Sequence, residues 1–401
     1  NDGVNLKLNK DFKVENFTQT EGDCFANILS LDSDSNGNVY TVGDFGTGKY
    51  TSSKLKLGSF SINSNRETDP FISKLDKSLN WKWSEAISTT AWSNASGIDL
   101  DNKGNIVVCG FYYRTPKVGD FQLTNSGWYD AFIGKLSNEG KWIWVQRYGG
   151  SSFEQAEDVT HLSDDSLVFV GGFQKTALVG KNVLTSKGGG AWGVGDEIVI
   201  GKLSSNGDWL WSQRAGGNGN DRGWTVSSDS DDNIYIGGRF SNTADFGGLE
   251  FTSKGSTDGF ISKLNSNGEW LWTRTIGTTG TDFVSELEVD SEGNILICGD
   301  FSGSTTLGNF KIASAGKSDV FVAKIDTNGN WVSVETHGGP NDDFRINITS
   351  RKGVYAFSCQ FGENFSLNTH KSESERTLYS EKGTLLFVSS DEYAGVNTSP
   401  Y

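Results

Sequence analysis

Apolar and polar positions divide the chain into many short segments. In DGFISKLNSNGEWLWTRTIG, for example, two apolar runs flank the turn SNGE. Short or alternating apolar runs bounded by Asn, Asp, Ser and Gly predict β-strands joined by tight turns. No stretch keeps the 3.6-residue period of an amphipathic helix. The pattern therefore predicts an all-β protein.

The strands recur as a repeat of about 61 residues, marked by three features. An apolar strand ending near Gly-x-Phe occurs six times, as in NILICGDF. The first tryptophan of a W-x-W element recurs at Trp81, Trp142, Trp209, Trp270 and Trp331. The acid that opens the preceding strand is assigned to Asp69, Asp130, Asp196, Asp258 and Asp319. Three markers at one period indicate copies of one structural unit.

Each unit holds about four strands, which predicts a six-bladed β-propeller of four-stranded blades in one domain. The units start near residues 22, 91, 151, 218, 280 and 340. A linear solenoid is the alternative, and it would need a cap at each end. Residues 1–21 resemble a W-x-W strand, and the C-terminal GTLLFVSSD resembles the strand before it. We therefore expect residues 1–21 to complete the last blade and close the ring.

Charge and hydropathy restrict the partners. The 401 residues carry a net charge of −15, which argues against a nucleic-acid partner and against docking on an anionic membrane. No apolar run is long enough to span a bilayer, so we expect no membrane insertion. Because the chain begins at Asn1 and contains no methionine, we expect a processed form or a piece of a longer protein.

The repeat resembles the bacterial SBBP repeats, a family named for β-propellers. The similar segments are DAFIGKLSNEGKWIWVQRYGG and DSEGNILICGDF, and the resemblance covers nearly the whole chain. It implies a secreted, extracellular or cell-surface protein that is a subunit of a larger surface assembly. The family name refers to seven blades, whereas six units are found here, and the sixth lacks the aspartate and the tryptophan pair.

The repeated motifs are predicted to serve the fold. Tryptophans of a W-x-W pair face the same side of a strand and suit packing between blades, with a sugar-stacking row as the alternative. The repeated acids suit hydrogen bonds to nearby backbone amides. Acidic loops such as DSDSNGN suit hairpin turns, although a weak Ca²⁺ site is the alternative. An EF-hand-type loop would need glutamate where Gly43 stands.

Cysteine and histidine give little sign of chemistry. Four cysteines occur without CxxC spacing, so no metal site is assigned. They are expected to be small buried residues, with a Cys24–Cys359 disulfide as the alternative. The histidines share no motif, no GxSxG, HExxH or P-loop sequence occurs, and we assign no catalytic residue and no cofactor.

The loops between blades depart from the repeat, and this is where function is expected. In a propeller they gather at one mouth of the central channel. The candidate ligand-binding residues there are Trp92, Glu154, Asp158, Asp221, Arg222, Trp224, Asp282, Asp342 and Arg345. The first hypothesis is a non-catalytic binding or structural module for an extracellular protein or glycan. The alternative is a carbohydrate-active enzyme, a glycoside hydrolase or lyase, with acids at the channel mouth.

Overall fold

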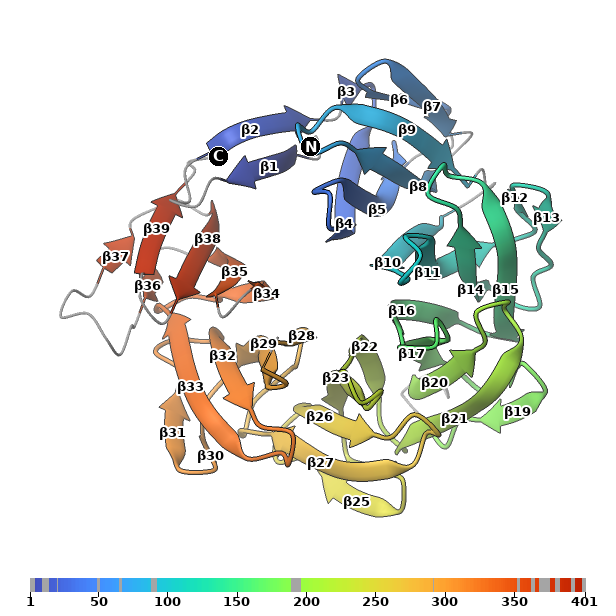
Figure 1. Cartoon of the computed structure of the whole chain (residues 1–401). Helices are drawn as coiled ribbons and strands as arrows, with labels where there is room; N and C mark the ends of the chain where they lie inside the picture. The colour runs from blue at the N-terminus through green and yellow to red at the C-terminus, as the bar shows by residue number, and fades with distance from the viewer. Residues whose placement is uncertain are drawn as a thin grey trace. The chain divides into compact units, whose positions relative to one another are not determined.

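A computed structural model describes the chain except for residues 1–3, 9–13, 20, 49–50, 65–66, 88–91, 189–195, 291, 352–353, 362–364, 368–375, 379–382, 391–393 and 399–401. Side chains are described for neither residues 1–20 nor residues 345–347 and 349–401. The chain divides into two compact units, one of residues 1–187 and 196–214 and the other of residues 188–195 and 215–401. Every element among the described residues is a β-strand (Figure 1).

Unit 1 contains three four-stranded antiparallel blades. Within a blade, each strand pairs with that blade's next strand in chain order. The first blade consists of β4 (Phe25–Ser33), β5 (Val39–Gly46), β8 (Thr68–Leu75) and β9 (Trp81–Ala86). The second consists of β10 (Asn94–Leu100), β11 (Ile106–Tyr113), β14 (Tyr129–Leu136) and β15 (Trp142–Gly150). The third consists of β16 (Glu154–His161), β17 (Leu167–Phe173), β20 (Glu197–Leu203) and β21 (Trp209–Gly217).

Unit 2 repeats the same strand order in three further sheets. The fourth blade consists of β22 (Arg222–Ser228), β23 (Ile234–Phe240), β26 (Asp258–Leu264) and β27 (Trp270–Ile276). The fifth consists of β28 (Glu286–Val289), β29 (Ile295–Phe301), β32 (Asp319–Ile325) and β33 (Trp331–Gly338). The last consists of β34 (Phe344–Arg351), β35 (Val354–Phe361), β38 (Gly383–Ser390) and β39 (Ala394–Thr398).

A hairpin lies between the second and third strands of each blade. Its strands are β6 (Ser53–Leu57) and β7 (Phe60–Ser64), β12 (Lys117–Val118) and β13 (Phe121–Gln122), β18 (Thr176–Val179) and β19 (Asn182–Thr185), β24 (Thr243–Phe246) and β25 (Leu249–Thr252), β30 (Ser304–Leu307) and β31 (Phe310–Ala313), and β36 (Phe365–Leu367) and β37 (Arg376–Leu378). Three of these hairpins pair with the outer strand that precedes them: β18 with β15 in unit 1, β36 with β33 in unit 2, and β24 with Gly216 and Gly217, the end of β21 that belongs to unit 2. The hairpins thus fasten consecutive blades together.

The W-x-W pairs also hold consecutive blades together, which confirms the predicted packing role of these tryptophans. The first tryptophan lies under the glycine turn of a hairpin, so a Cβ on Gly180 would come within 2.7 Å of the Trp209 ring. The second reaches the following blade, because the indole Nε1 of Trp144 donates to the Ser205 carbonyl at 3.1 Å. Trp83 and Trp272 donate in the same way to the carbonyls of Asn138 and Thr327.

The acids that open the third strands accept backbone hydrogen bonds, as predicted. Asp130 accepts from the Ser126 amide at 3.1 Å, and Asp319 accepts from the Ala315 amide at 2.7 Å. The strand register corrects one assignment in this series: Phe173 pairs with Glu197, so Glu197, and not Asp196, is the equivalent acid. Sequence spacing missed it because the loop before this strand is longer and the acid is a glutamate.

The acidic hairpin loops close on themselves, which explains their composition. The Asp34 carboxylate accepts from the amides of Asn36 and Asn38 at 3.0 and 2.9 Å. Asp229 and Asp290 hold their turns with the same pair of amide contacts. The hairpin-turn prediction is therefore confirmed for these loops.

The chain ends pair differently from the expectation. β1 (Val4–Leu8) pairs with β2 (Val14–Gln19), and a short strand, β3 (Glu21–Gly22), pairs with β6. The last blade obtains its fourth strand from β39, which pairs with β38. The expected completion of that blade by residues 1–21 is therefore corrected, since a C-terminal strand already stands at that edge. Six-fold closure of a ring stays a prediction.

The Gly-Gly pair after W-x-W explains how the hairpin docks so closely. A Cβ on Gly149 would lie 2.3 Å from the Asp130 carboxyl carbon, and one on Gly150 would lie 2.0 Å from the Thr176 carbonyl oxygen of the hairpin. In the fourth blade Thr278 replaces the second glycine, and the following hairpin β30–β31 forms a separate two-stranded sheet. Close backbone approach is therefore the function of this glycine.

We expect Gly150→Ala to lower the free energy of unfolding by about 2–4 kcal/mol, because the methyl group would overlap a backbone oxygen that cannot rotate away. Urea denaturation of purified protein measures the change. Ser151→Ala, at an adjacent exposed residue, is the control and should change stability by less than about 0.5 kcal/mol. Equal midpoints for the two variants would contradict the close hairpin contact.

Candidate functional site

Three of the predicted ligand-binding acids lie in the crossovers between blades, but they are buried. Glu154, Asp221 and Asp282 all have no exposed surface. Each accepts a hydrogen bond from the backbone amide four residues earlier, at Gly150, Gly217 and Thr278 respectively, at 2.6–2.8 Å. Asp221 and Asp282 also accept from the amides of Ser241 and Ser302, which follow the second strand. These carboxylates act as brackets that hold the crossover to its blade.

This placement departs from the expectation that the three acids face a ligand. Burial raises the pKa of Asp282 to about 6 and that of Glu154 to about 8. The sequence signal was ambiguous because the acids occur at one position in successive crossovers. Ser93 takes the same position in the first crossover, where its hydroxyl accepts from the Tyr113 amide at 3.4 Å.

The other predicted residues occupy different surroundings. Trp92 is 55% exposed, and Asp342 is an exposed residue whose carboxylate lies 3.3 Å from Lys317 Nζ. Asp158 is half-buried in β16, where its carboxylate accepts from the Val159 amide. Arg345 lies in β34, but its side chain is outside the described residues.

Arg222 and Trp224 lie in β22, and Trp224 belongs to a small aromatic cluster in unit 2. The Trp224 and Phe283 rings meet edge to face at 5.2 Å between centroids. The Arg239 guanidinium lies over both rings, at 5.1 and 5.5 Å. Sequence reasoning missed Arg239 and Phe283, because Arg239 occupies the variable position of the Gly-x-Phe marker in the adjacent strand, β23, and Phe283 was not among the candidates.

Unit 1 carries a larger cluster, which we call the aromatic patch: Phe111, Tyr113, Trp128, Tyr129 and Phe153. Tyr129 stacks on Phe153 at 5.2 Å between centroids, and Trp128 meets Phe153 at 5.4 Å. Tyr129 also contacts Tyr113 at 5.6 Å and the buried Phe111 at 5.3 Å. Trp128 is 63% exposed, and this surface lies beside the crossover from the second to the third blade.

The backbone holds the aromatic patch in place. Tyr129 and Phe153 form a parallel bridge, and the Trp128 amide donates to the Ser152 carbonyl at 3.0 Å. A Cβ on Gly127 would lie 2.5 Å from the Gly150 carbonyl, so glycine permits this approach. The predicted residue Trp92 precedes Ser93 in the adjacent crossover, and the Ser93 hydroxyl accepts from the Tyr113 amide at 3.4 Å. The rings are therefore fixed before any partner arrives.

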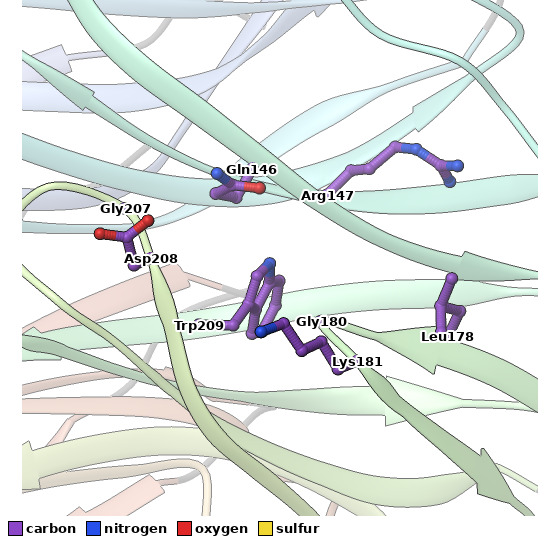
Figure 2. Close-up of a pocket in the computed structure, with 8 residues that line it drawn as sticks. All are labelled: Gln146, Arg147, Leu178, Gly180, Lys181, Gly207, Asp208 and Trp209. Carbon is purple, nitrogen blue, oxygen red and sulfur yellow. The ribbon is translucent and has the colours of Figure 1, made fainter.

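A hollow of about 450 Å³ lies on the outer side of the second and third blades (Figure 2). It is lined by Gln146, Arg147, Leu178, Gly180, Lys181, Gly207, Asp208 and Trp209. Arg147 is engaged elsewhere, since its Nη1 lies 2.7 Å from the Asp130 carboxylate. The hollow contains a single carboxylate, that of Asp208, and so lacks the paired acids of a glycoside hydrolase.

Titratable groups meet where the first strands of the three unit 1 blades adjoin. Asp32 is hydrogen-bonded to Asp99, and Asp99 Oδ2 accepts from both the amide and the Nδ1 of His161 at 2.7 Å. Asp32 also accepts from the Leu100 amide at 3.0 Å. Burial and the neighbouring Asp99 raise the pKa of Asp32 to about 7. Hydrogen bonding to Asp99 raises the pKa of His161.

The described part of the chain shows neither a metal-binding cluster nor a membrane-spanning helix. There, no three Asp, Glu, His or Cys side chains are placed to hold a metal ion. No helix in that part has the length and hydropathy needed to cross a bilayer. The Cys24–Cys359 alternative lies outside the described residues, because the Cys359 side chain is not among them, and the weak Ca²⁺ site stays a prediction.

Comparison with known proteins adds a similarity to WD-repeat proteins. No family model matches the chain. It is 23% identical over 353 residues to an uncharacterized WD repeat-containing protein, L264, of Acanthamoeba polyphaga mimivirus, which covers 72% of this chain. The chain spans about a quarter of that protein's length.

Two solved structures give low structural similarity. A protein of unknown function from Bacteroides caccae matches with a TM-score of 0.41 and 10% identity, covering 82% of this chain and 88% of its own. The WD40 domain of Neurospora crassa Pan2 matches with a TM-score of 0.39 and 9% identity, covering 83% and 86%. The all-β fold with propeller-type blades is consistent with the WD-repeat similarity. No comparison is specific to the SBBP repeats.

We expect Asp282→Ala to lower the free energy of unfolding by about 2–4 kcal/mol, because two buried backbone amides would lose their acceptor. Asp342→Ala is the matched control from the neighbouring crossover, where an exposed ion pair contributes less than about 1 kcal/mol. Thermal and urea unfolding measure both. A larger loss for Asp342→Ala would contradict the bracket role.

The free energy of unfolding should fall as pH rises from about 4 to 8. The pKa of Asp32 is raised in the folded protein from its ordinary 3.8 to about 7, so its stabilising effect is complete below pH 3.8 and is lost as pH rises through 7. The raised pKa of His161 acts in the same direction, with the loss beginning above its ordinary 6.5.

Asp32→Asn should keep the hydrogen bond to Asp99, remove the charge and flatten this dependence. We expect a gain of about 1–2 kcal/mol at pH 8 relative to the wild type, measured by urea unfolding at pH 5.5 and pH 8. Asp208→Asn, at an exposed turn, should leave the pH dependence unchanged. An unchanged slope in Asp32→Asn would contradict the raised pKa of Asp32.

Proposed function

We propose that the chain is a non-catalytic interaction module that acts outside the cell or on its surface and binds a protein or glycan through the aromatic patch. The observation that carries the proposal is the exposure of Trp128 on rings already packed against one another. Clustered, pre-ordered tryptophan and tyrosine side chains are typical of binding surfaces, because they contribute a large contact area at low entropic cost.

Three further features support this function. The crossover acids Glu154, Asp221 and Asp282 bind the protein's own backbone, so they are poorly suited to act on a substrate. Asp32 and Asp99 are within hydrogen-bonding distance, closer than the about 5–10 Å between the acids of glycoside hydrolases. The similarity to a WD-repeat protein and the propeller-type blades favour an interaction module.

Location outside the cell is part of the proposal. The acidic charge and the resemblance to SBBP repeats support it. Membership of a surface assembly is compatible with a binding patch confined to one end of the blades.

Retention of partners on the immobilised full chain tests the function. Secreted and surface material from the source organism is passed over the wild type and over Trp128→Ala/Phe153→Ala, and the bound protein and bound carbohydrate are both quantified. We expect the double variant to retain at least about tenfold less, as for loss of a binding hot spot.

Ile143→Ala/Leu210→Ala is the matched control, because both residues are about half exposed and lie in outer strands away from the aromatic patch. Near-ultraviolet circular dichroism and the melting temperature confirm that each variant is folded. Equal retention by the two double variants, or none by the wild type, would overturn the proposed function.

A further inference from the structure

We propose that the aromatic patch binds a neutral oligosaccharide, with a sugar ring stacked on Trp128. This inference rests on the proposed function and names its ligand class. It follows from three properties of the surface: the rigidity of its rings, the chemistry of the groups around them and the distribution of exposed aliphatic side chains.

The rings form a supported platform. Trp128 contacts Phe153, Phe153 stacks on Tyr129 with an interplanar angle of 29°, and Tyr129 rests on Phe111, which is 8% exposed. Such a stack keeps the exposed ring at a fixed inclination. A pyranose with equatorial hydroxyl groups presents C–H bonds on its two faces, and these are attracted to the electron-rich face of an aromatic ring.

Neutral hydrogen-bonding groups surround the platform. The side chains of Asn125 and Gln174 are half-buried neutral amides: Asn125 accepts from the Gly127 amide at 3.0 Å, and Gln174 Oε1 accepts from the buried Ser152 hydroxyl at 2.8 Å. Gln155 is half-buried in the strand that begins after Phe153. Amides and hydroxyls both donate and accept, as sugar hydroxyls do, so they can pair with a ligand that has no charge.

Charge favours a neutral glycan over an acidic one. The acids closest in sequence to the rings, Asp130 and Glu154, are buried and bind the backbone. Two cations lie near the rings: Arg114 lies over the Tyr113 ring at 5.5 Å, and Arg147 is neutralised by Asp130, whose carboxylate lies 2.7 Å from its Nη1. The chain as a whole carries −15, which repels polyanions at long range.

The distribution of aliphatic side chains argues against a protein partner at this patch. Large exposed aliphatic residues in unit 1 lie in other elements, namely Leu29 and Leu31 in β4, Ile143 in β15, Leu178 in β18, Val183 in β19 and Leu210 in β21. A protein hot spot is normally surrounded by contacts that exclude water. Here the neighbouring half-buried polar side chains include the amides of Asn125, Gln155 and Gln174, which suit a hydrated sugar chain.

Trp92 offers a second ring in the adjacent crossover. Its neighbour Ser93 binds the Tyr113 backbone, which brings that crossover to the edge of the aromatic patch. Trp92 and Phe153 occupy equivalent positions, each directly before the residue that brackets its crossover. A linear oligosaccharide therefore has two aromatic contacts available, and a longer chain should bind more tightly than a monosaccharide.

Calorimetry and NMR with defined sugars test the inference on the full chain. The probes are the β-1,4-linked hexasaccharides of glucose, mannose and xylose, with a hexagalacturonate as the charged comparison. We expect millimolar or tighter binding of at least one neutral probe, at least about tenfold weaker binding in Trp128→Ala, and intermediate binding in Trp128→Phe. Leu210→Ala and Arg114→Gln should bind as the wild type does.

The results that would overturn the glycan inference differ from those that would overturn the proposed function. No binding of any neutral probe, or binding unaffected by Trp128→Ala, would overturn the glycan inference, as would hexagalacturonate binding that depends on Arg114. If surface material retained by the wild type depends on Trp128 but survives periodate treatment and is lost with protease, the partner is a protein. In that case the interaction module stands and the glycan inference falls.

Discussion

Close contact between aromatic rings and glycine backbone is the constraint on which the blades depend. The first tryptophan of each of the four W-x-W pairs packs under a glycine whose φ is positive, at Gly58, Gly119, Gly180 and Gly247, and Trp331 packs under Gly308 in the same way although Ser333 stands in the second tryptophan position. Any side chain there would be strained and would strike the indole. The second tryptophan of three pairs, Trp83, Trp144 and Trp272, donates to a carbonyl of the next blade. One motif therefore closes a hairpin over its own blade and joins that blade to its neighbour.

Close packing against glycine also explains how the buried acids fit into the blades. Third-strand carboxylates fit because Gly149, Gly277 and Gly338 leave room for them. Crossover carboxylates then capture the backbone amides that the turns leave without partners. Burial makes each of these groups costly to ionise, which raises the pKa of Asp130, Asp282 and Asp319 to about 6. The pairings are effective because several amides converge on each carboxylate.

Most of the fold could be predicted from sequence, because every copy of the repeat has the same packing requirements and therefore shows the same residue pattern. Strand type, the four-strand unit and the packing role of the tryptophans followed from periodicity alone. Glu197 and the pairing of β39 with β38 could not, since a changed loop length and a degenerate last unit conceal them. For the crossover acids, sequence gave the position but not the direction of the side chain. Only the coordinates show that Glu154, Asp221 and Asp282 turn inward to their own backbone.

The aromatic patch escaped prediction for the opposite reason. Trp128 lies in a loop, Tyr129 opens a strand and Phe153 lies in a crossover, so no common spacing links them. Their contact arises because the crossover pairs with the start of β14 through the Ser152 carbonyl. The brackets make that contact rigid: Glu154, adjacent to Phe153, is tied to the Gly150 amide. The repeated scaffold residues thus hold the few non-repeated aromatic side chains in place. A binding surface that is already ordered loses less entropy when a partner binds, which favours selective binding.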